Sequence, residues 1–281
     1  MLKTGLLTFY HIHHYGAMLQ AYATERAVES LGSGCEIIDY YVNQDNALFQ
    51  RPTGLGSAAH DAHTALHYGP LKARYERFET FSRDHLRISG RRYESLAELR
   101  QADLPYDLLL SGSDQIWNPK IFPDGHFDPV FFGAFTDQRK IAYAPSFGIP
   151  RIPEEMEEEL RGYLSQFSHL SVRERQGQRI VRDLTGREAE MVLDPTLLLT
   201  ADQWRTMASE TPFTGRGALP KGGYLLCYCI SRPGALEPYI RRLAAQTGLP
   251  VVQLCGIRQK VHPKARCVLD AGPGEFLSLF A

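Results

Sequence analysis

Short apolar runs alternate with amphipathic stretches through the first 200 residues. The apolar run at 2–9 is followed at 17–31 by apolar side chains spaced three and four apart, which end at Gly32. A second apolar run lies at 35–39. This pattern predicts a strand, a helix and a second strand parallel to the first, because a crossover helix joins parallel strands.

The same alternation resumes after a looser stretch. We predict further strands at 107–110, 140–144, 169–173 and 190–193, and helices at 70–85, 94–100, 153–167 and 174–184. The helix at 153–167 has proline and a run of glutamates at its amino-terminal end, where the helix dipole favours negative charge. Six strands with intervening helices indicate a doubly wound α/β domain with a mostly parallel, Rossmann-like sheet.

The alternation also predicts how the chain divides into domains. Residues 1–200 form the first Rossmann-like domain, with a helical insertion at about 41–92. Residues 201–223 are predicted as a linker, since 211–223 is rich in Gly, Pro and Thr. Residues 224–281 resume the pattern, with strands at 224–230, 250–255 and 266–269 and helices at 235–247 and 274–280. About 60 residues are marginal for an independent core, so we expect a shortened second Rossmann-like domain.

Composition and charge exclude several classes of protein. The chain of 281 residues is 43% hydrophobic and 22% charged, which is typical of globular proteins. Its net charge of −1 offers no broad basic surface for nucleic acid or anionic membranes. No stretch approaches the roughly 20 apolar residues of a membrane span, and the first residues do not resemble a signal peptide. Five cysteines without a CxxC pair indicate reduced thiols, so we expect a cytoplasmic protein.

Four segments are expected to meet at one edge of the predicted sheet. Ligands of open parallel sheets bind at the carboxyl ends of the strands, where helices begin with free N–H groups. The segments that follow predicted strands there are 8–16, 111–117, 146–148 and Arg173. Their convergence, more than any single motif, indicates a binding site.

Each candidate residue also has a structural interpretation. Asp114 could orient or deprotonate a hydroxyl, while Ser113 or Asp114 could equally cap a helix. Arg173 could form a bidentate contact with a carboxylate or phosphate, or it could form a structural ion pair with Glu174 or Asp194. Ser146 could bind a ligand or only end a strand. These alternatives stay open from sequence alone.

Metal and nucleotide chemistry find little support. His11 and His13 would share one face of an extended segment, but no Cys or carboxylate ligand is near them in sequence, so we expect no metal site. Cys227 and Cys229 are expected to be buried apolar groups of a strand. Neither a G-x-G-x-x-G nor a P-loop pattern is present.

Several strings of residues, in order along the chain, resemble the polysaccharide pyruvyl transferase family. The opening string differs from the family's N-Y-G-A-x-L-Q-A-Y-A only in its first residue, His14, which replaces Asn. The strings are H-Y-G-A-M-L-Q-A-Y-A at 14–23, E-I-I-D-Y at 36–40, S-G-S-D-Q-I-W-N-P at 111–119, K-I-A-Y-A-P-S-F-G at 140–148, S-V-R-E at 171–174 and L-D-P-T-L-L at 193–198.

The resemblance implies a fold and a reaction. It implies a GT-B-like architecture of two facing Rossmann-like domains, and transfer of the enolpyruvyl group of phosphoenolpyruvate to two hydroxyls of a sugar, with phosphate released. The acceptor would belong to a polysaccharide or its precursor, as in exopolysaccharide biosynthesis. A lipid-linked acceptor and a homo-oligomer stay open, and no cofactor beyond the donor substrate is expected.

The resemblance places Arg173 in the cationic clamp for the donor. Asp114 as the group that orients or deprotonates the acceptor is our inference from the residues, and these two are the predicted catalytic residues. The predicted substrate-binding residues are His14, Tyr15, Gly16, Ser111, Gly112, Ser113, Gln115, Ser146 and Phe147.

Two departures from the family pattern qualify these expectations. His14 could alter contacts with the acceptor or titrate near neutral pH. The chain ends at Ala281, before an S-F-H-G-like segment whose histidine is implicated in donor binding, so we expect weak or absent transfer if this chain is the whole molecule. Two further readings stay open: a GT-B enzyme with a nucleotide-sugar donor, and a non-catalytic remnant that binds sugar or protein.

Overall fold

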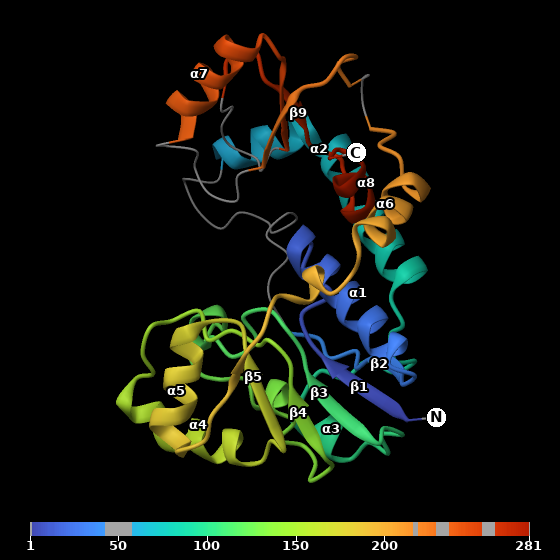
Figure 1. The fold of residues 1–281 in the computed structure, drawn as a ribbon. Coiled ribbons are helices and arrows are strands. Elements are labelled where there is room, and N and C mark those ends of the chain that lie inside the picture. The colour runs from blue at the N-terminus through green and yellow to red at the C-terminus, as the bar shows by residue number, and fades with distance from the viewer. Residues whose placement is uncertain (1, 43–57, 216–218, 229–235, 255–261, 281) are drawn as a thin grey trace. The chain divides into compact units, whose positions relative to one another are not determined.

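The computed structural model describes residues 2–42, 58–215, 219–228, 236–254 and 262–280, with the backbone alone for 58–67. The chain divides into two compact units (Figure 1). The first contains residues 1–46 and 82–200, and the second contains 47–81 and 201–281. Part of the predicted helical insertion, 43–57, lies outside the described residues.

The described residues of the first unit form a six-stranded parallel sheet in the order β2-β1-β3-β4-β5-β6. Its strands are β1 (Lys3–Leu7), β2 (Gly34–Ile37), β3 (Leu108–Ser111), β4 (Lys140–Ala142), β5 (His169–Val172) and β6 (Glu190–Met191). Strand order reverses between β1 and β3, since β2 lies on one side of β1 and all later strands lie on the other. Such a reversal opens a crevice at the carboxyl edge.

Helices connect these strands, and their ends agree with local sequence signals. They are α1 (Tyr15–Ser30), α3 (Leu96–Arg100), α4 (Glu154–Ser165) and α5 (Arg175–Thr185), with short 3-10 helices η1 (Pro119–Ile121), η2 (Pro129–Phe132) and η3 (Pro195–Leu197). Gly186, at φ 68°, ends α5 in the left-handed conformation that glycine adopts without strain. Right-handed crossovers place α1 on one face of the sheet and α4 and α5 on the other.

The core of this unit is rich in aromatic rings. Trp117 is fully buried and stacks on Phe132, with ring centroids 5.1 Å apart. Phe147 lies 5.3 Å from the same indole, and Phe9 packs edge-on against Phe131 at 5.0 Å. Burying rings of this size is worth roughly 2–3 kcal/mol each. These buried ring contacts therefore hold the loop after β3 against the core.

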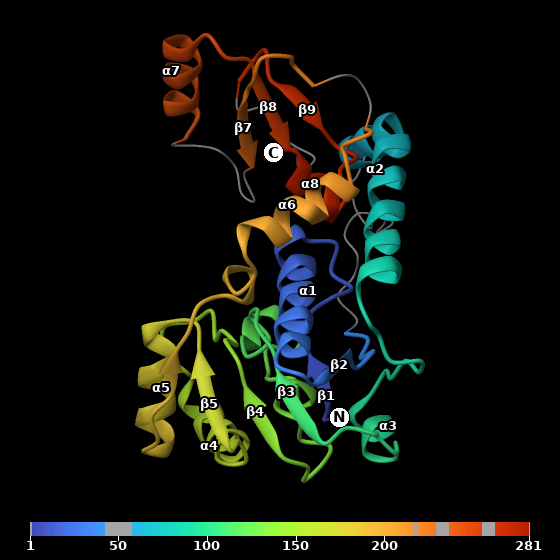
Figure 2. The same cartoon turned by 45° about the vertical axis from the view of Figure 1, so that its right-hand side comes forward.

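The second unit contains a three-stranded parallel sheet among its described residues (Figure 2). Its elements are α2 (Ala58–His85), whose last turn belongs to the first unit, α6 (Ala201–Glu210), β7 (Leu225–Tyr228), α7 (Glu237–Thr247), β8 (Val251–Leu254), β9 (Arg266–Val268) and α8 (Pro273–Ser278). Arg77 of α2 donates to the carbonyl of Asp270, and its Nε lies 3.1 Å from Glu275. Partly buried contacts of Arg77 thus tie α2 to the segment around α8.

The prediction of an α/β protein with a parallel sheet is confirmed. Most observed strands and helices match the predicted ones to within a few residues where the structure describes them, but α2 begins at Ala58, twelve residues before the predicted start at 70. Two segments differ from expectation. The predicted linker at 201–223 begins with the helix α6, and most of α2, expected as an insertion in the first domain, groups with the second unit. Residues 216–218, 229–230, 235 and 255, on which predicted elements partly fall, lie outside the described residues.

No helix in the described ranges combines the length and the apolar character needed to cross a bilayer.

Candidate functional site

The carboxyl edge of the six-stranded sheet gathers all four segments expected there. Residues 8–16 follow β1, 112–117 follow β3, 143–148 follow β4 and Arg173 follows β5. The turns after β3 and β4 are paired directly, since Asp114 forms a parallel bridge with Pro145. The backbone N–H of Arg173 donates to the carbonyl of Pro145 at 3.4 Å. Three successive strand ends are therefore in contact.

The turn after β3 begins inside the core. The hydroxyl of Ser111 is buried and donates to the carbonyl of Phe131 at 2.7 Å. A Cβ on Gly112 would lie 2.7 Å from Cδ1 of the buried Leu6, so a larger residue here would force the Leu6 side chain to shift. Ser111 and Gly112 thus set the path of the turn, and their side-chain positions face neighbouring protein.

Asp114 holds a left-handed conformation at the centre of this turn, with φ 76°. Its carboxylate accepts the N–H of Gln115 at 2.8 Å, and its carbonyl accepts the N–H of Ser146 at 2.8 Å. A non-glycine residue in this conformation costs roughly 1 kcal/mol or more, and such strain is concentrated at functional sites. Asp114 begins no long helix, so its strained position directs its half-buried carboxylate at the sheet edge.

Gln115 and Ser146 stabilise the paired turns. The amide of Asn118 donates to Gln115 Oε1 at 2.7 Å, and Ser146 Oγ accepts the N–H of Gly148 at 3.2 Å. Gly148 has φ 62°, and a Cβ there would overlap both amide side chains. Phe147 is fully buried against Trp117, so its ring packs in the core.

Ser113 contributes a buried hydroxyl that makes no hydrogen bond within the described part of the chain. Its carbonyl accepts the hydroxyl of Thr8 at 3.0 Å, and Gln20 Nε2 donates to Thr8 Oγ1 at 2.8 Å. Gln20 also donates to the carbonyls of Phe9 and Ala17, both near 3 Å. This network locks the ends of β1 and β3 to the first turn of α1 across the point where strand order reverses.

Thr8 and Gln20 were not among the predicted site residues. The available signal was Gln20 within the opening string at 14–23.

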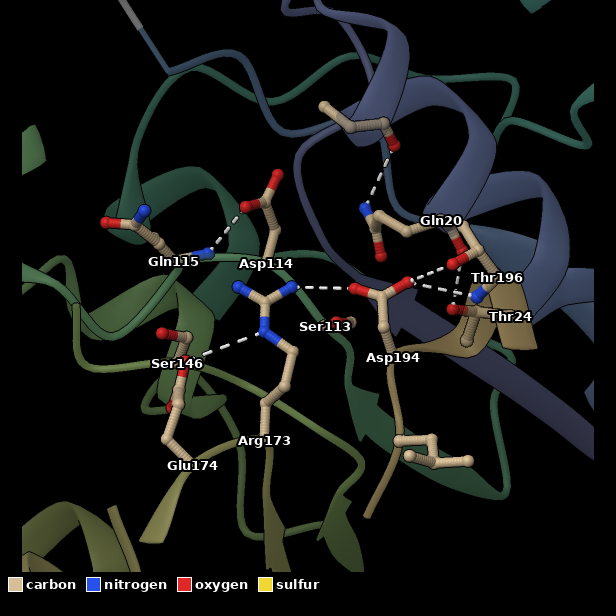
Figure 3. Close-up of polar contacts among 12 residues, drawn as sticks. Gln20, Thr24, Ser113, Asp114, Gln115, Ser146, Arg173, Glu174, Asp194 and Thr196 are labelled. Atoms are coloured by element: carbon tan, nitrogen blue, oxygen red, sulfur yellow. Dashed lines mark hydrogen bonds and ion pairs between the residues drawn. The ribbon is translucent and has the colours of Figure 1, made fainter. Parts of the chain in front are cut away.

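Arg173 points from the end of β5 toward Asp194, as Figure 3 shows. Its Nη1 donates to Asp194 Oδ2 at 2.7 Å, and its Nε lies 3.5 Å from Glu174 Oε1. Both alternative partners named from sequence are therefore present. The guanidinium remains about a quarter exposed, and among the described residues its Nη2 has no hydrogen-bond partner. One side of the guanidinium is therefore held by carboxylates, and the other side is available to a ligand.

Asp194 is itself held in place by the D-P-T string. Its Oδ1 accepts the N–H of Thr196 at 3.0 Å and the hydroxyl of Thr196 at 2.7 Å (Figure 3). Asp194 thereby caps η3 with one oxygen and positions Arg173 with the other.

His14, Tyr15 and Gly16 form the start of α1. His14 stands at the cap position without a side-chain capping bond, and no acidic residue occupies the first turn. Tyr15 is buried, and a Cβ on Gly16 would lie 3.1 Å from the His14 ring. The amino end of α1 therefore keeps its positive dipole at the carboxyl edge of the sheet. Within the described residues, no group of three His, Cys, Asp or Glu side chains is arranged to hold a metal ion.

Comparisons with known proteins agree with the strings that build this edge. No curated protein matches the chain at a significant level. The family model for polysaccharide pyruvyl transferases matches residues 14–245, which include α1, both paired turns, Arg173 and the D-P-T string. Because this match covers most of the sequence, the chain belongs to the polysaccharide pyruvyl transferase family.

Proposed function

We propose that this protein transfers the enolpyruvyl group of phosphoenolpyruvate to two hydroxyls of a saccharide and forms a pyruvate ketal. Membership of the family supports transferase activity on a polysaccharide or its precursor. The observation that carries the proposal within the structure is the half-anchored guanidinium of Arg173 at the carboxyl edge, beside the strained turn of Asp114.

Arg173 supplies positive charge to the donor. A planar guanidinium binds carboxylate or phosphate oxygens through two parallel N–H donors, and Asp194 fixes its orientation before the donor arrives. The neighbouring carboxylates of Asp194 and Glu174 offset that charge, so Arg173 alone cannot neutralise a trianion. We therefore assign further donor contacts to groups beyond Arg173, such as the positive end of the α1 dipole, whose first turn holds no acidic residue.

Asp114 acts on the acceptor. In the proposed reaction one sugar hydroxyl attacks C2 of the donor while C3 gains a proton and becomes a methyl group. Phosphate then leaves with its bonding electrons, and the second hydroxyl attacks C2 to close the ketal. Of the two hydroxyl protons, one balances the new methyl group and the other leaves with phosphate. A carboxylate held at hydrogen-bond distance from the first hydroxyl would orient it and accept its proton.

The two-unit division is compatible with a GT-B-like enzyme in which each unit carries a parallel sheet. We propose this architecture for the family, with the acceptor and donor bound at the carboxyl edges of the sheets.

The proposal is tested by incubating the protein with phosphoenolpyruvate and saccharide acceptors, and by measuring phosphate release together with the ketal product by NMR. A nucleotide-sugar donor assayed in parallel separates the glycosyltransferase alternative. Product from the nucleotide sugar alone, or binding of sugar without turnover of either donor, would refute the proposal.

Arg173→Ala is expected to raise the donor KM and lower kcat/KM by roughly 100-fold or more, because it removes charge stabilisation worth about 3 kcal/mol. Arg182→Ala is the matched control, since Arg182 is a half-exposed arginine of α5 whose nearest carboxylate is 3.9 Å away. Equal kinetics for the two variants would remove Arg173 from the site.

A further inference from the structure

A cleft of about 460 Å³ lies at the same carboxyl edge, beside the end of β2. It falls in the size range of small-molecule sites. Its lining includes Tyr40, Tyr41, Glu94, Asp124, His126 and Asp128. They come from three separate segments of the first unit, so the cleft is a product of the fold and not of one loop.

The walls of this cleft are fixed. Tyr40 donates its hydroxyl to Asp128 Oδ2 at 2.8 Å, and Asp128 Oδ1 accepts the N–H of Val130 at 2.9 Å. Tyr41 stacks on the His11 ring at 5.6 Å, with the guanidinium of Arg92 5.5 Å from its own ring. A preformed wall loses little conformational entropy when a ligand binds.

The charge of the lining selects the chemistry of the ligand. The lining includes three acidic residues, Glu94, Asp124 and Asp128, and one histidine, His126. Like charges repel, so a phosphate or carboxylate ligand is disfavoured here. Burial raises the pKa of Asp128 above its ordinary value, although its carboxylate accepts hydrogen bonds from Tyr40 and Val130. The described residues offer no arrangement of three such ligands around a metal ion.

Aromatic rings and carboxylates together match a neutral polyol. Rings with a polar edge pack against the C–H face of a pyranose, and carboxylate oxygens accept hydroxyl protons in hydrogen bonds stronger than neutral ones. The exposed carboxylates of Glu94 and Asp124 stand at the rim, while Tyr40 and Asp128 lie deeper.

The position of the cleft sets a minimum length for an acceptor that reaches both the cleft and Arg173. In the sheet order, β2 and β5 are separated by β1, β3 and β4. Four strand spacings of about 4.8 Å place the end of β2, which Tyr40 and Tyr41 follow, roughly 19 Å from the end of β5, which Arg173 follows. A monosaccharide cannot occupy the cleft and react at Arg173 at once.

We propose that this cleft binds a neutral sugar unit of an extended acceptor, several units away from the ring that receives the pyruvyl group. This inference rests on the proposed function for the identity of the acceptor, but its binding step needs no donor. It makes the protein selective for oligosaccharides over monosaccharides.

The test is binding of neutral tetrasaccharides, made of glucose, mannose, galactose or N-acetylglucosamine units, measured by saturation-transfer NMR without phosphoenolpyruvate. We expect at least one to bind at least tenfold more tightly than its monosaccharide. The double variant Glu94→Gln/Asp124→Asn should weaken that binding at least fivefold, and both positions are exposed, so the fold is preserved. Asp128→Asn is a second, deeper probe, and Glu155→Gln, an exposed carboxylate on α4, is the matched control.

Three results would overturn the inference: no tetrasaccharide binds, binding is unchanged in the double variant, or the double variant weakens binding of phosphoenolpyruvate instead. Ketal formation with an acceptor KM insensitive to these variants would reject the cleft while the proposed function stands. Oligosaccharide binding that the variants abolish, without any ketal product, would reject the proposed function while the cleft stands.

Discussion

Glu25 provides the sharpest test of the energetics of the first unit. Its side chain on α1 is fully buried, and burial raises its pKa to about 7. Its Oε2 accepts the N–H of Arg87 at 2.9 Å, and its Oε1 lies 3.2 Å from Arg26 without forming a hydrogen bond. These contacts only partly offset the loss of water around the carboxylate.

The sign of the pH dependence follows from this raised pKa. Between about pH 4.5 and 7 the folded protein holds a proton on Glu25 that the unfolded chain has released, so stability falls as pH rises through this range. A pKa that differs by one between the two states is worth about 1.4 kcal/mol, which gives a cost of about 3 kcal/mol above pH 7. Below pH 4.5 the cost disappears.

Glu25→Gln imitates the protonated acid and keeps an acceptor for Arg87. We expect the variant to match the wild-type free energy of unfolding at pH 4 and to exceed it by up to about 3 kcal/mol at pH 8, measured by urea denaturation at both pH values. Glu29→Gln is the control on the same helix, because its side chain keeps 20% exposure and shares the same arginines. A Glu25→Gln difference that does not change with pH would refute the reasoning.

Three further variants probe the candidate site. Gly148→Ala should destabilise the protein by about 2–3 kcal/mol in chemical denaturation, because an alanine in the left-handed conformation is strained and its Cβ would break the hydrogen bond between Gln115 and Asn118. An unchanged denaturation midpoint would contradict this. Ser113→Ala removes a buried hydroxyl that has no hydrogen-bond partner among the described residues. The free energy of unfolding should therefore change by less than about 0.5 kcal/mol, while the acceptor KM rises. Unaltered kinetics would count against a contact between Ser113 and the substrate. Asp194→Asn should lower both kcat and the donor KM. Without the Asp194 carboxylate, the Arg173 guanidinium keeps its full charge for the anionic donor, which lowers KM, but it is less well oriented, which lowers kcat. A steady-state assay in which neither constant changes would reject the positioning role of Asp194.

The sequence by itself determined the local structure and the family. Alternation with the periods of strand and helix located β1 to β5 and their helices, because a strand buried in a parallel sheet must be apolar along its length and a helix must bury one stripe. The predicted strand at 190–193 corresponds to β6, a short exposed strand at the edge of the sheet. The strings at 14–23, 111–119 and 193–198 were sufficient for the family. Strand ends also predicted which turns would share an edge, since parallel strands all end on the same side.

Only the tertiary structure decided which side chains meet at the carboxyl edge of the sheet and which of their polar groups can reach a ligand. The Phe147 ring lies in the core although its string surrounds the site, and Arg173 pairs with a carboxylate 21 residues away while keeping one edge available. Tyr40 joins Asp128 across 88 positions to form the cleft, and Arg77 ties α2 to a segment nearly 200 residues later. Such contacts depend on how whole elements pack, and no periodicity of the chain records distances between residues so far apart in sequence.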